Sequence, residues 1–404
     1  LDKSQILTVR NLAEYSVEKF AEKDFCRFIR DGEILVKSYK EFYEDALSIC
    51  RYIRSKSKEK MNIGFIGKTS YEYIACLTGM IFSGNTVVPF APDISVEEAV
   101  ELFDDADIEI LFCEEEFAEK ALMIKRNFGG LRDIISLGDW QWFENIYKEF
   151  SSDSAYAALS DVEVEPERCA LIIYTSGTTG KRKGVMLSQR NIVENACAVI
   201  DYEDITGTSM LVLPIHHTFG FTASVLGVLI YGHPIAINRN LRTFVNDIAE
   251  YKPQSIFVVP MFIEALYKKI WKSIEQKKMT TVFKGLLKTS NALRKIGIDR
   301  RRQIFGSILE AFGGEVKMII SGGAPINPEI LDFFRAMGIT TLNGYGITEC
   351  APLVSCNRNE WQKNGSVGLP IIGEEVRIFE PDANGEGEIC VKGPNVMMGY
   401  YEEP

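Results

Sequence analysis

The sequence has few residues of the kinds that bind metals or form cross-links. It holds only three histidines, and none of its nine cysteines is spaced from another as C-x2-C. This scarcity argues against a zinc module and against a disulfide framework, and it is typical of reduced thiols in a cytoplasmic protein. Long apolar runs are absent too. The best candidate, residues 219–231, is shorter than the ~20 residues that a membrane-spanning helix needs.

Positive charge is in deficit over the chain as a whole. Lys plus Arg total 45 against 56 Asp plus Glu, which gives a formal net charge of −11. Such a chain has no overall field that attracts nucleic acid, so we expect no nucleic-acid partner. Residues 268–302 are the exception, with twelve basic and only two acidic residues. Two interpretations stay open: a solvated pair of helices, or peripheral contact with an anionic membrane surface or a phosphorylated ligand.

Apolar and polar residues alternate in a way that is typical of α/β proteins. In the first part of the chain, apolar runs that predict strands alternate with helical patterns: strands at 62–66, 86–90 and 108–113, and helices at 70–83, 94–104 and 114–126. Repeated strand–helix alternation predicts mostly parallel sheets covered by helices.

The same alternation resumes after a polar connection at 151–168. Further elements are expected there: strands at 169–174, 210–213, 235–237, 255–259 and 316–321, and a helix at 188–199 with Ser188 as its N-cap. Near the C-terminus, two short strands flank Asn384-Gly385, which predicts a β-hairpin over 375–391. We therefore expect one domain over 1–404, with lobes at roughly 1–165 and 166–345 and a smaller β-rich lobe at 346–404.

The strongest local signal is the string YTSGTTGKRKGV, which begins at Tyr174. A buried strand leads into a loop of small hydroxyl and glycine residues, and cations and then a helix are expected to follow. Glycines let backbone N–H groups approach and cradle an anion, the hydroxyls add donors, and Lys183 adds a positive charge. The string therefore predicts a polyphosphate site. It is not a Walker-type loop, since Gly177 and Gly180 are too close together. The alternative is a flexible connector. It would need additional residues between the expected strand and helix, and the loop has none to spare.

At these residues the sequence resembles the adenylate-forming superfamily, the AMP-binding acyl- and aryl-CoA synthetases and their luciferase relatives. Other segments follow in the order of that superfamily: LPIHHTFG at 213–220, SGGAP at 321–325, NGYGITE at 343–349, and a stretch at 385–401 similar to GExxxxGPxxMxGYY. The resemblance covers nearly the whole chain. Arg182 stands where the superfamily usually has proline, and we expect this difference to alter the rigidity of the loop.

The resemblance implies a fold like the N-terminal domain of acyl-CoA synthetases and luciferases, and it assigns the nucleotide site. The residues implied to bind the nucleotide are Thr175, Ser176, Gly177, Thr178, Thr179, Gly180, Lys183, Gly323, Ala324, Pro325, Asn343, Gly344, Tyr345, Gly346 and Thr348. In the superfamily the tyrosine stacks on adenine and the threonine of the last motif contacts the α-phosphate. Glu349 is the implied Mg²⁺ ligand, with Thr178 as a further candidate.

The same resemblance places the acid pocket at His217, Phe219 and Gly220 and gives Lys183, His217, Thr348 and Glu349 catalytic roles. A carboxylate that attacks a phosphate meets like-charge repulsion, and a metal ion, a lysine and backbone dipoles offset it. Each motif alone has a plainer interpretation. His217 fits a core histidine, SGGAP and NGYG fit ordinary turns, and Glu349 fits a surface acid.

The implied function is ATP-dependent activation of a carboxylic acid to an acyl-adenylate with release of pyrophosphate, followed by thioester formation with coenzyme A. A medium- or long-chain fatty acid is the favoured substrate. Small residues in 219–231 leave room for an acyl tunnel, although close helix packing explains them equally well. The basic stretch at 268–302 resembles an insertion in long-chain acyl-CoA synthetases. The alternatives are an enzyme that loads a carrier protein, and a non-catalytic nucleotide- or acyl-binding module.

Members of the superfamily continue beyond the GYY segment with a ribose-binding aspartate, a hinge and a small C-terminal domain that carries a catalytic lysine. This sequence ends at Pro404, before all three. We therefore expect the chain as written to bind nucleotide and acid, to adenylate weakly, and to need the small domain for the coenzyme A step.

Overall fold

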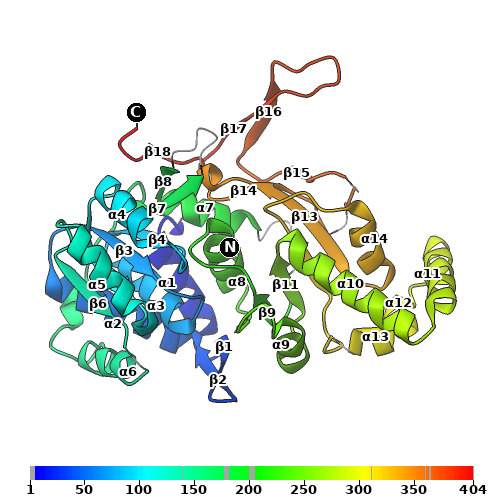
Figure 1. Cartoon of the computed structure of the whole chain (residues 1–404), viewed down its shortest axis with the longest axis horizontal. Coiled ribbons are helices and arrows are strands. Elements are labelled where there is room, and N and C mark those ends of the chain that lie inside the picture. Colours follow the sequence, from blue (N-terminus) through cyan, green and yellow to red (C-terminus); the bar gives the residue numbers. More distant parts are fainter. Residues whose placement is uncertain are drawn as a thin grey trace.

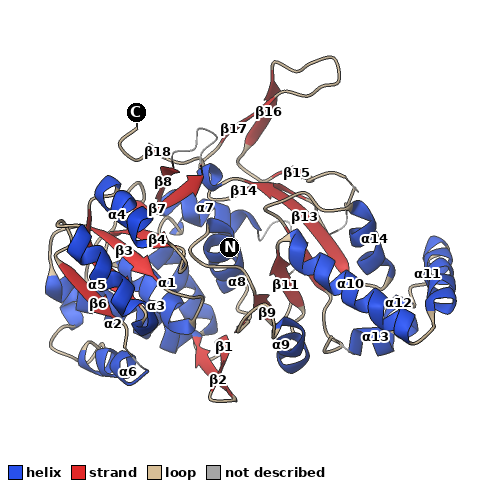
Figure 2. Cartoon of the chain, viewed as in Figure 1, coloured by secondary structure: helices blue, strands red, loops and turns tan. Residues whose placement is uncertain are grey.

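The computed structural model describes residues 5–138, 140–176, 182–199, 205–310, 312–359, 361–363 and 365–403. Within them the chain forms two large mixed sheets covered by helices and a small two-stranded sheet (Figures 1 and 2). The α/β fold class expected from the sequence is confirmed. No helix in the described part of the chain is both long and apolar enough to cross a bilayer.

The seven-stranded sheet has the order β18-β8-β7-β4-β3-β5-β6 and lies at the left of Figure 1. Its strands are β3 (Asn62–Ile66), β4 (Thr86–Phe90), β5 (Ile108–Cys113), β6 (Asp133–Ser136), β7 (Cys169–Ser176), β8 (Arg182–Ser188) and β18 (Gly399–Tyr400). The strands from β7 to β6 run parallel, and β8 and β18 add antiparallel neighbours at one edge. Its helices are α2 (Tyr39–Lys56), α3 (Tyr71–Phe82), α4 (Val96–Asp105), α5 (Ala118–Asn127) and α6 (Trp140–Glu149).

The nine-stranded sheet has the order β15-β14-β13-β12-β11-β9-β10-β1-β2. Its strands are β1 (Asp24–Arg30), β2 (Glu33–Ser38), β9 (Ser209–Leu211), β10 (Ile235–Ile237), β11 (Ser255–Val258), β12 (Met318–Ser321), β13 (Thr340–Gly346), β14 (Leu353–Cys356) and β15 (Leu369–Pro370). The strands from β13 to β1 run parallel, and both ends of the sheet are antiparallel. Parallel strands of this kind are buried on both faces, which explains their continuous apolar runs.

Helices cover the nine-stranded sheet and fill the space between the two sheets (Figure 2). They are α1 (Val9–Phe20), α7 (Gln189–Val199), the π-helical segment η4 (Phe219–Leu226), α8 (Gly227–Leu229), α9 (Phe244–Tyr251), α10 (Pro260–Gln276), α11 (Thr280–Lys295), α12 (Arg301–Ile304), α13 (Gly306–Glu310) and α14 (Pro328–Ala336). The largest apolar core joins residues of both sheets through α7 and η4, so the sheets share one interior.

The strands of each sheet come from both sides of the lobe boundaries expected near 165 and 345. The first hairpin, β1–β2, joins the nine-stranded sheet, while β7 and β8 extend the seven-stranded one. The C-terminal part is divided as well. β14 and β15 pair next to β13, β18 pairs with β8, and only β16 (Glu375–Phe379) and β17 (Glu388–Lys392) stand apart as the projecting hairpin at the top of Figure 1.

The projecting hairpin was expected from Asn384-Gly385, and the prediction is confirmed. Gly385 has φ +82, a left-handed conformation that glycine adopts without strain. The Asp382 carboxylate accepts hydrogen bonds from the backbone N–H groups of Asn384 and Glu386, at 2.8 and 2.9 Å. These two bonds fix the turn.

One prediction was wrong next to the phosphate-loop motif. We expected the cations there to lead directly into a helix, but Arg182–Ser188 forms strand β8 and the helix begins only at Gln189. The apolar residues Val185 and Leu187 are buried, and pairing with β8 satisfies the backbone edge of β7. The expected cap is confirmed, because the Ser188 hydroxyl accepts a hydrogen bond from the Asn191 N–H at 3.1 Å.

Candidate active site

The phosphate-loop motif lies at the open end of the β7–β8 hairpin. Thr175 pairs with Lys183 and Ser176 with Arg182, so the two strands approach each other where the loop begins and ends. The expected nucleotide ligands Gly177, Thr178, Thr179 and Gly180 lie outside the described residues. Arg182, at the position of the usual proline, forms an ion pair with Glu98 in the first turn of α4.

Lys183 and Glu349 are linked through one tyrosine. The Lys183 ammonium lies 4.7 Å from the centre of the Tyr400 ring, and the Tyr400 hydroxyl donates a hydrogen bond of 3.0 Å to Glu349 Oε1. Partial burial, together with this bond and the glutamate charge, raises the pKa of Tyr400. The Lys183 ammonium also lies 3.3 Å from a Glu403 carboxylate oxygen. Strand β18 therefore carries a residue that joins two of the expected catalytic positions.

Glu349 belongs to the 3-10 turn η5 (Thr348–Cys350), which two asparagine side chains anchor. Asn195, fully buried on α7, donates to the Cys350 and Leu353 carbonyls at 3.0 and 2.8 Å. Asn395 donates to the same two carbonyls, at 2.8 and 3.2 Å. The backbone of the turn is thereby fixed from two directions, and Thr348 and Glu349 are held half-buried between β13 and β14.

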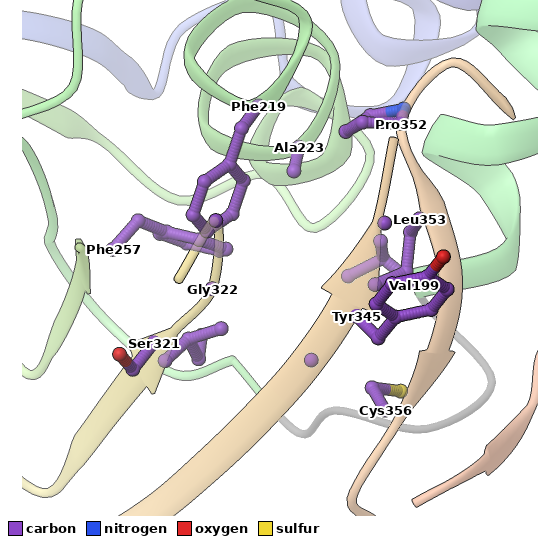
Figure 3. A pocket seen from close by; sticks show the side chains of 14 residues that line it. Val199, Phe219, Ala223, Phe257, Ser321, Gly322, Tyr345, Pro352, Leu353 and Cys356 are labelled. Atoms are coloured by element: carbon purple, nitrogen blue, oxygen red, sulfur yellow. The ribbon is translucent and has the colours of Figure 1, made fainter. Parts of the chain in front are cut away.

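A pocket opens between η4 and the ends of β12 and β13 (Figure 3). It contains about 520 Å³ of free space, including its mouth. Phe219 and Phe257 lie on one side, and Tyr345 and Leu353 lie on the other. Of the residues expected to bind nucleotide, those that line it are Gly323, Gly344, Tyr345 and Gly346. Ala324 and Asn343 are chain neighbours of lining residues but do not line it themselves, and Pro325 lies one residue further along.

Of the three residues expected to form the acid pocket, only Phe219 lines this one. Gly220 instead packs against the Pro214 carbonyl, so closely that a Cβ would lie 2.2 Å from its oxygen. His217 precedes η4, and its ring centre lies 4.3 Å from that of His216. Partial burial lowers the pKa of His217, while burial and then the His217 charge lower the pKa of His216 to about 4. Both rings are therefore neutral near pH 7 and offer hydrogen bonds but no cationic charge.

Two buried polar atoms beside the pocket have no hydrogen-bond partner within the described part of the chain. They are Ser321 Oγ, from a residue that lines the pocket, and Asn343 Oδ1 on the adjoining strand. An unpaired buried polar atom costs roughly 1–3 kcal/mol. Such atoms are suited to bind a polar ligand. The resemblance named Asn343 as a nucleotide ligand, and it placed Ser321 in the SGGAP motif without giving it a role of its own.

The side chains around Glu349 are suited to a Mg²⁺ ion that takes most of its ligands from a bound substrate and only one from the protein. Groups of three or more His, Cys, Asp or Glu side chains that could enclose a metal are absent from the described residues. Mg²⁺ is commonly held by one or two carboxylates together with substrate phosphates. A single half-buried carboxylate, one of whose oxygens accepts from Tyr400, meets that requirement.

The comparison with known families identifies this arrangement. A sequence model described as "AMP-binding enzyme" matches residues 13–401. The chain belongs to the AMP-binding enzyme family. Fatty acyl-CoA synthetase B of Dictyostelium discoideum is 27% identical over 401 residues, which cover 89% of this chain and 59% of that protein. The chain therefore spans less than two thirds of the length of this curated relative.

Solved structures share the AMP-binding fold. VinN in complex with L-aspartate superposes with a TM-score of 0.77 at 21% identity, covering 98% of this chain and 91% of that one. A long-chain-fatty-acid-CoA ligase of Archaeoglobus fulgidus superposes with a TM-score of 0.76 at 19% identity, covering 98% and 77%. At these identities the likeness shows the fold alone.

Glu374, near the anchored turn, is a half-buried acid whose carboxylate oxygens are buried, and the sequence did not single it out. It lies close to Asn395, because a Cβ on Gly393 would lie 2.9 Å from Glu374 Cγ and 3.0 Å from Asn395 Oδ1. No group in the described residues meets hydrogen-bond geometry with either carboxylate oxygen, although the Asn395 amide lies close enough to favour the charged form. Burial raises the pKa of Glu374 from 4.5 to about 8.

Replacing Glu374 with Gln should make stability less dependent on pH. The folded state binds the Glu374 proton more tightly than the unfolded state, so its contribution is present below about pH 4.5 and is lost as pH rises through about 8. Between pH 5 and pH 9 we expect the free energy of unfolding of the variant to rise relative to wild type by about 1–2 kcal/mol, a value reduced for partial solvent exposure. Urea unfolding at both pH values measures it.

Glu375→Gln, at an exposed neighbouring position, is the matched control and should follow wild type. Equal pH dependence of the Glu374→Gln variant and wild type would show that the Glu374 carboxyl is not protonated in the folded protein.

Proposed function

We propose that the protein containing this chain is an AMP-forming ligase that activates a medium- or long-chain fatty acid with ATP and transfers the acyl group to coenzyme A. The observation that carries the proposal is the pocket itself. It brings Gly323 and Tyr345, from the nucleotide motifs, together with Phe219 from the acid-pocket motif. A site for this reaction must bring an acid and a nucleotide into contact.

In this proposal Tyr345 packs against the purine, since an aromatic ring on the pocket wall offers a stacking face. The unpaired Ser321 Oγ and Asn343 Oδ1 are candidate polar contacts for the nucleotide. Thr348 contacts the α-phosphate, and Lys183 and the loop at 175–180 hold the remaining phosphates. Tyr400 fixes the orientation of Glu349 and lies against Lys183, so that both side chains stay where charge develops.

Glu349 would hold Mg²⁺, with Thr178 as a further candidate ligand; when bound, the ion would neutralise phosphate charge as the carboxylate approaches. His217 acts as a neutral hydrogen-bonding group near the acid, because its lowered pKa leaves it uncharged at neutral pH. The carboxylate oxygen attacks the α-phosphorus, a P–O bond forms, and the bond to the departing pyrophosphate breaks. Coenzyme A then attacks the acyl carbon and AMP leaves.

Three observations support a fatty acid as the substrate. Ala223 on η4 places a small side chain on the pocket wall, which leaves width for an acyl chain. Fatty acyl-CoA synthetase B of Dictyostelium discoideum is a relative over most of the chain. Ten of the twelve basic residues at 268–302 are exposed on and around α11, where they would favour peripheral contact of a cytoplasmic protein with an anionic membrane that supplies the acid.

Acid-stimulated isotope exchange between pyrophosphate and ATP tests the proposed substrate class. Acetate, benzoate, octanoate and palmitate are compared, using the full-length natural protein. We expect octanoate or palmitate to stimulate exchange at least about tenfold more than acetate or benzoate, the selectivity that an apolar pocket supplies. Stimulation by acetate or benzoate alone would overturn the fatty-acid assignment. Thioester formation with free coenzyme A then separates this function from the loading of a carrier protein.

A further inference from the structure

A second pocket lies in the helical region at the lower right of Figure 1, between α10, α11 and the short helices α12 and α13. It contains about 980 Å³ of free space, part of it open to solvent, and shares no lining residue with the pocket beside Tyr345. We call it the α10–α13 groove.

The wall of the α10–α13 groove is apolar and rigidly packed. Ile270, Ile274, Phe283 and Phe305 contribute buried side chains to it. The rings of Phe283 and Phe305 meet edge to face with centres 5.6 Å apart, and the Trp271 ring packs against Phe283 with centres 5.3 Å apart. Because these rings support one another, the apolar surface exists before any ligand binds.

The rim of the groove is cationic along one side. Lys269, Ser273 and Lys277 all line it. Their spacing of four residues places them in a row along α10 and its C-terminal cap. Both lysines are exposed, and within the described residues neither forms an ion pair. A row of free ammonium groups above an apolar cleft is complementary to a molecule with one negative end and a long apolar body.

The mouth of the groove supports a single-chain ligand. Met279 lines it and is 46% exposed, so a flexible apolar side chain borders the opening. Ser273 and Ser307 add hydroxyls on the rim. A carboxylate needs no more than these donors and an ammonium group.

We propose that the α10–α13 groove is a second binding site for a free long-chain fatty acid. The carboxylate binds Lys269 or Lys277, and the acyl chain lies against Phe283 and Phe305. The site is separate from the proposed catalytic pocket, and it does not depend on which acid that pocket activates. It would let the protein hold a fatty acid without reacting it.

Two readouts on the full-length protein test the groove. Equilibrium dialysis with labelled palmitate, below its micelle concentration, gives the number of molecules bound per chain. Quenching of tryptophan fluorescence by a brominated stearate reports on the groove, because the Trp271 ring packs against Phe283, which lines it. The variants are the double charge reversal Lys269→Glu/Lys277→Glu and the space-filling Ser273→Phe, which adds no tryptophan to the groove. The matched control is Lys268→Glu/Lys272→Glu, which makes the same charge change at exposed α10 positions outside the groove.

We expect wild type and the control to bind two palmitates per chain and the charge-reversal variant to bind one. The control should retain quenching, and Trp271→Phe should remove most of the quenched signal. A groove variant that still binds one palmitate per chain, in the catalytic pocket, is thereby shown to be folded. If wild type binds only one palmitate per chain and the groove variants bind none, the result would support the groove and count against palmitate as the substrate of the catalytic pocket. Unchanged stoichiometry and quenching in both groove variants, or binding only to anionic vesicles, would overturn the groove proposal.

Discussion

Replacing Glu349 with Gln should lower acid-stimulated exchange between pyrophosphate and ATP by about 10²–10³-fold, the loss typical of removing one preorganised group that stabilises developing charge. The amide keeps the shape of the side chain and still accepts from Tyr400, but it carries no negative charge with which to hold Mg²⁺. The fold should survive, because Asn195 and Asn395 anchor the η5 backbone without using this side chain.

A magnesium titration separates a metal ligand from a merely structural residue. We expect the Glu349→Gln variant to need a higher Mg²⁺ concentration for half-maximal exchange, while the thermal midpoint stays close to that of wild type. Glu388→Gln on the exposed strand β17 makes the same change of charge away from the site and should behave as wild type. A Glu349→Gln variant with wild-type exchange and wild-type Mg²⁺ demand would remove Glu349 from the site.

Replacing Lys183 with Ala should weaken ATP binding by about 10–100-fold, since a hydrogen bond to a charged group contributes roughly 1.5–3 kcal/mol. Its other contacts are a cation–π contact with Tyr400 and an ion pair with Glu403, both partly exposed. Each is worth about 1 kcal/mol or less, so the loss of stability should be small. Isothermal titration with ATP measures the affinity.

Two comparisons make the Lys183 result specific. Lys183→Arg keeps the charge and should retain part of the affinity. Lys392→Ala, at a side chain that is 83% exposed, should bind ATP as wild type does. If Lys183→Ala binds ATP with unchanged affinity, the hairpin of β7 and β8 does not present this lysine to the phosphates.

The sequence predicted elements whose apolar pattern is local. The strands at 62–66, 86–90 and 108–113 coincide with β3, β4 and β5 because each is a short, mainly apolar run that is buried over most of its length. Strand β8 was missed, because its apolar run at 185–187 is short and was assigned to no element, although the helix expected at 188–199 does follow it. Its strand conformation depends on pairing with β7 on one side and with β18, more than two hundred residues later, on the other.

The residues of the candidate site likewise fall into two groups: those found from a local motif and those whose role depends on distant contacts. Tyr345 and Glu349 lie within a recognisable string, so the sequence pointed to them. Tyr400 also lies in a recognised stretch, 385–401, but the resemblance gave it no role, and Asn195 lies in no motif. The contacts of both residues with the turn at 348–353 follow from the tertiary fold. Phe219 lines the pocket while its neighbour Gly220 packs against Pro214, a distinction set by the π-helical start of η4.

The central claim is that a carboxylate attacks the α-phosphate of ATP in this protein. Palmitate labelled with oxygen-18 in both carboxylate oxygens tests it most directly, with hydroxylamine present to trap the activated acyl group. If an acyl-adenylate forms, hydroxylamine attacks the acyl carbon and the AMP that leaves carries one labelled oxygen. We therefore predict singly labelled AMP by mass spectrometry. Label in inorganic phosphate, or unlabelled AMP alongside hydroxamate, would contradict the account.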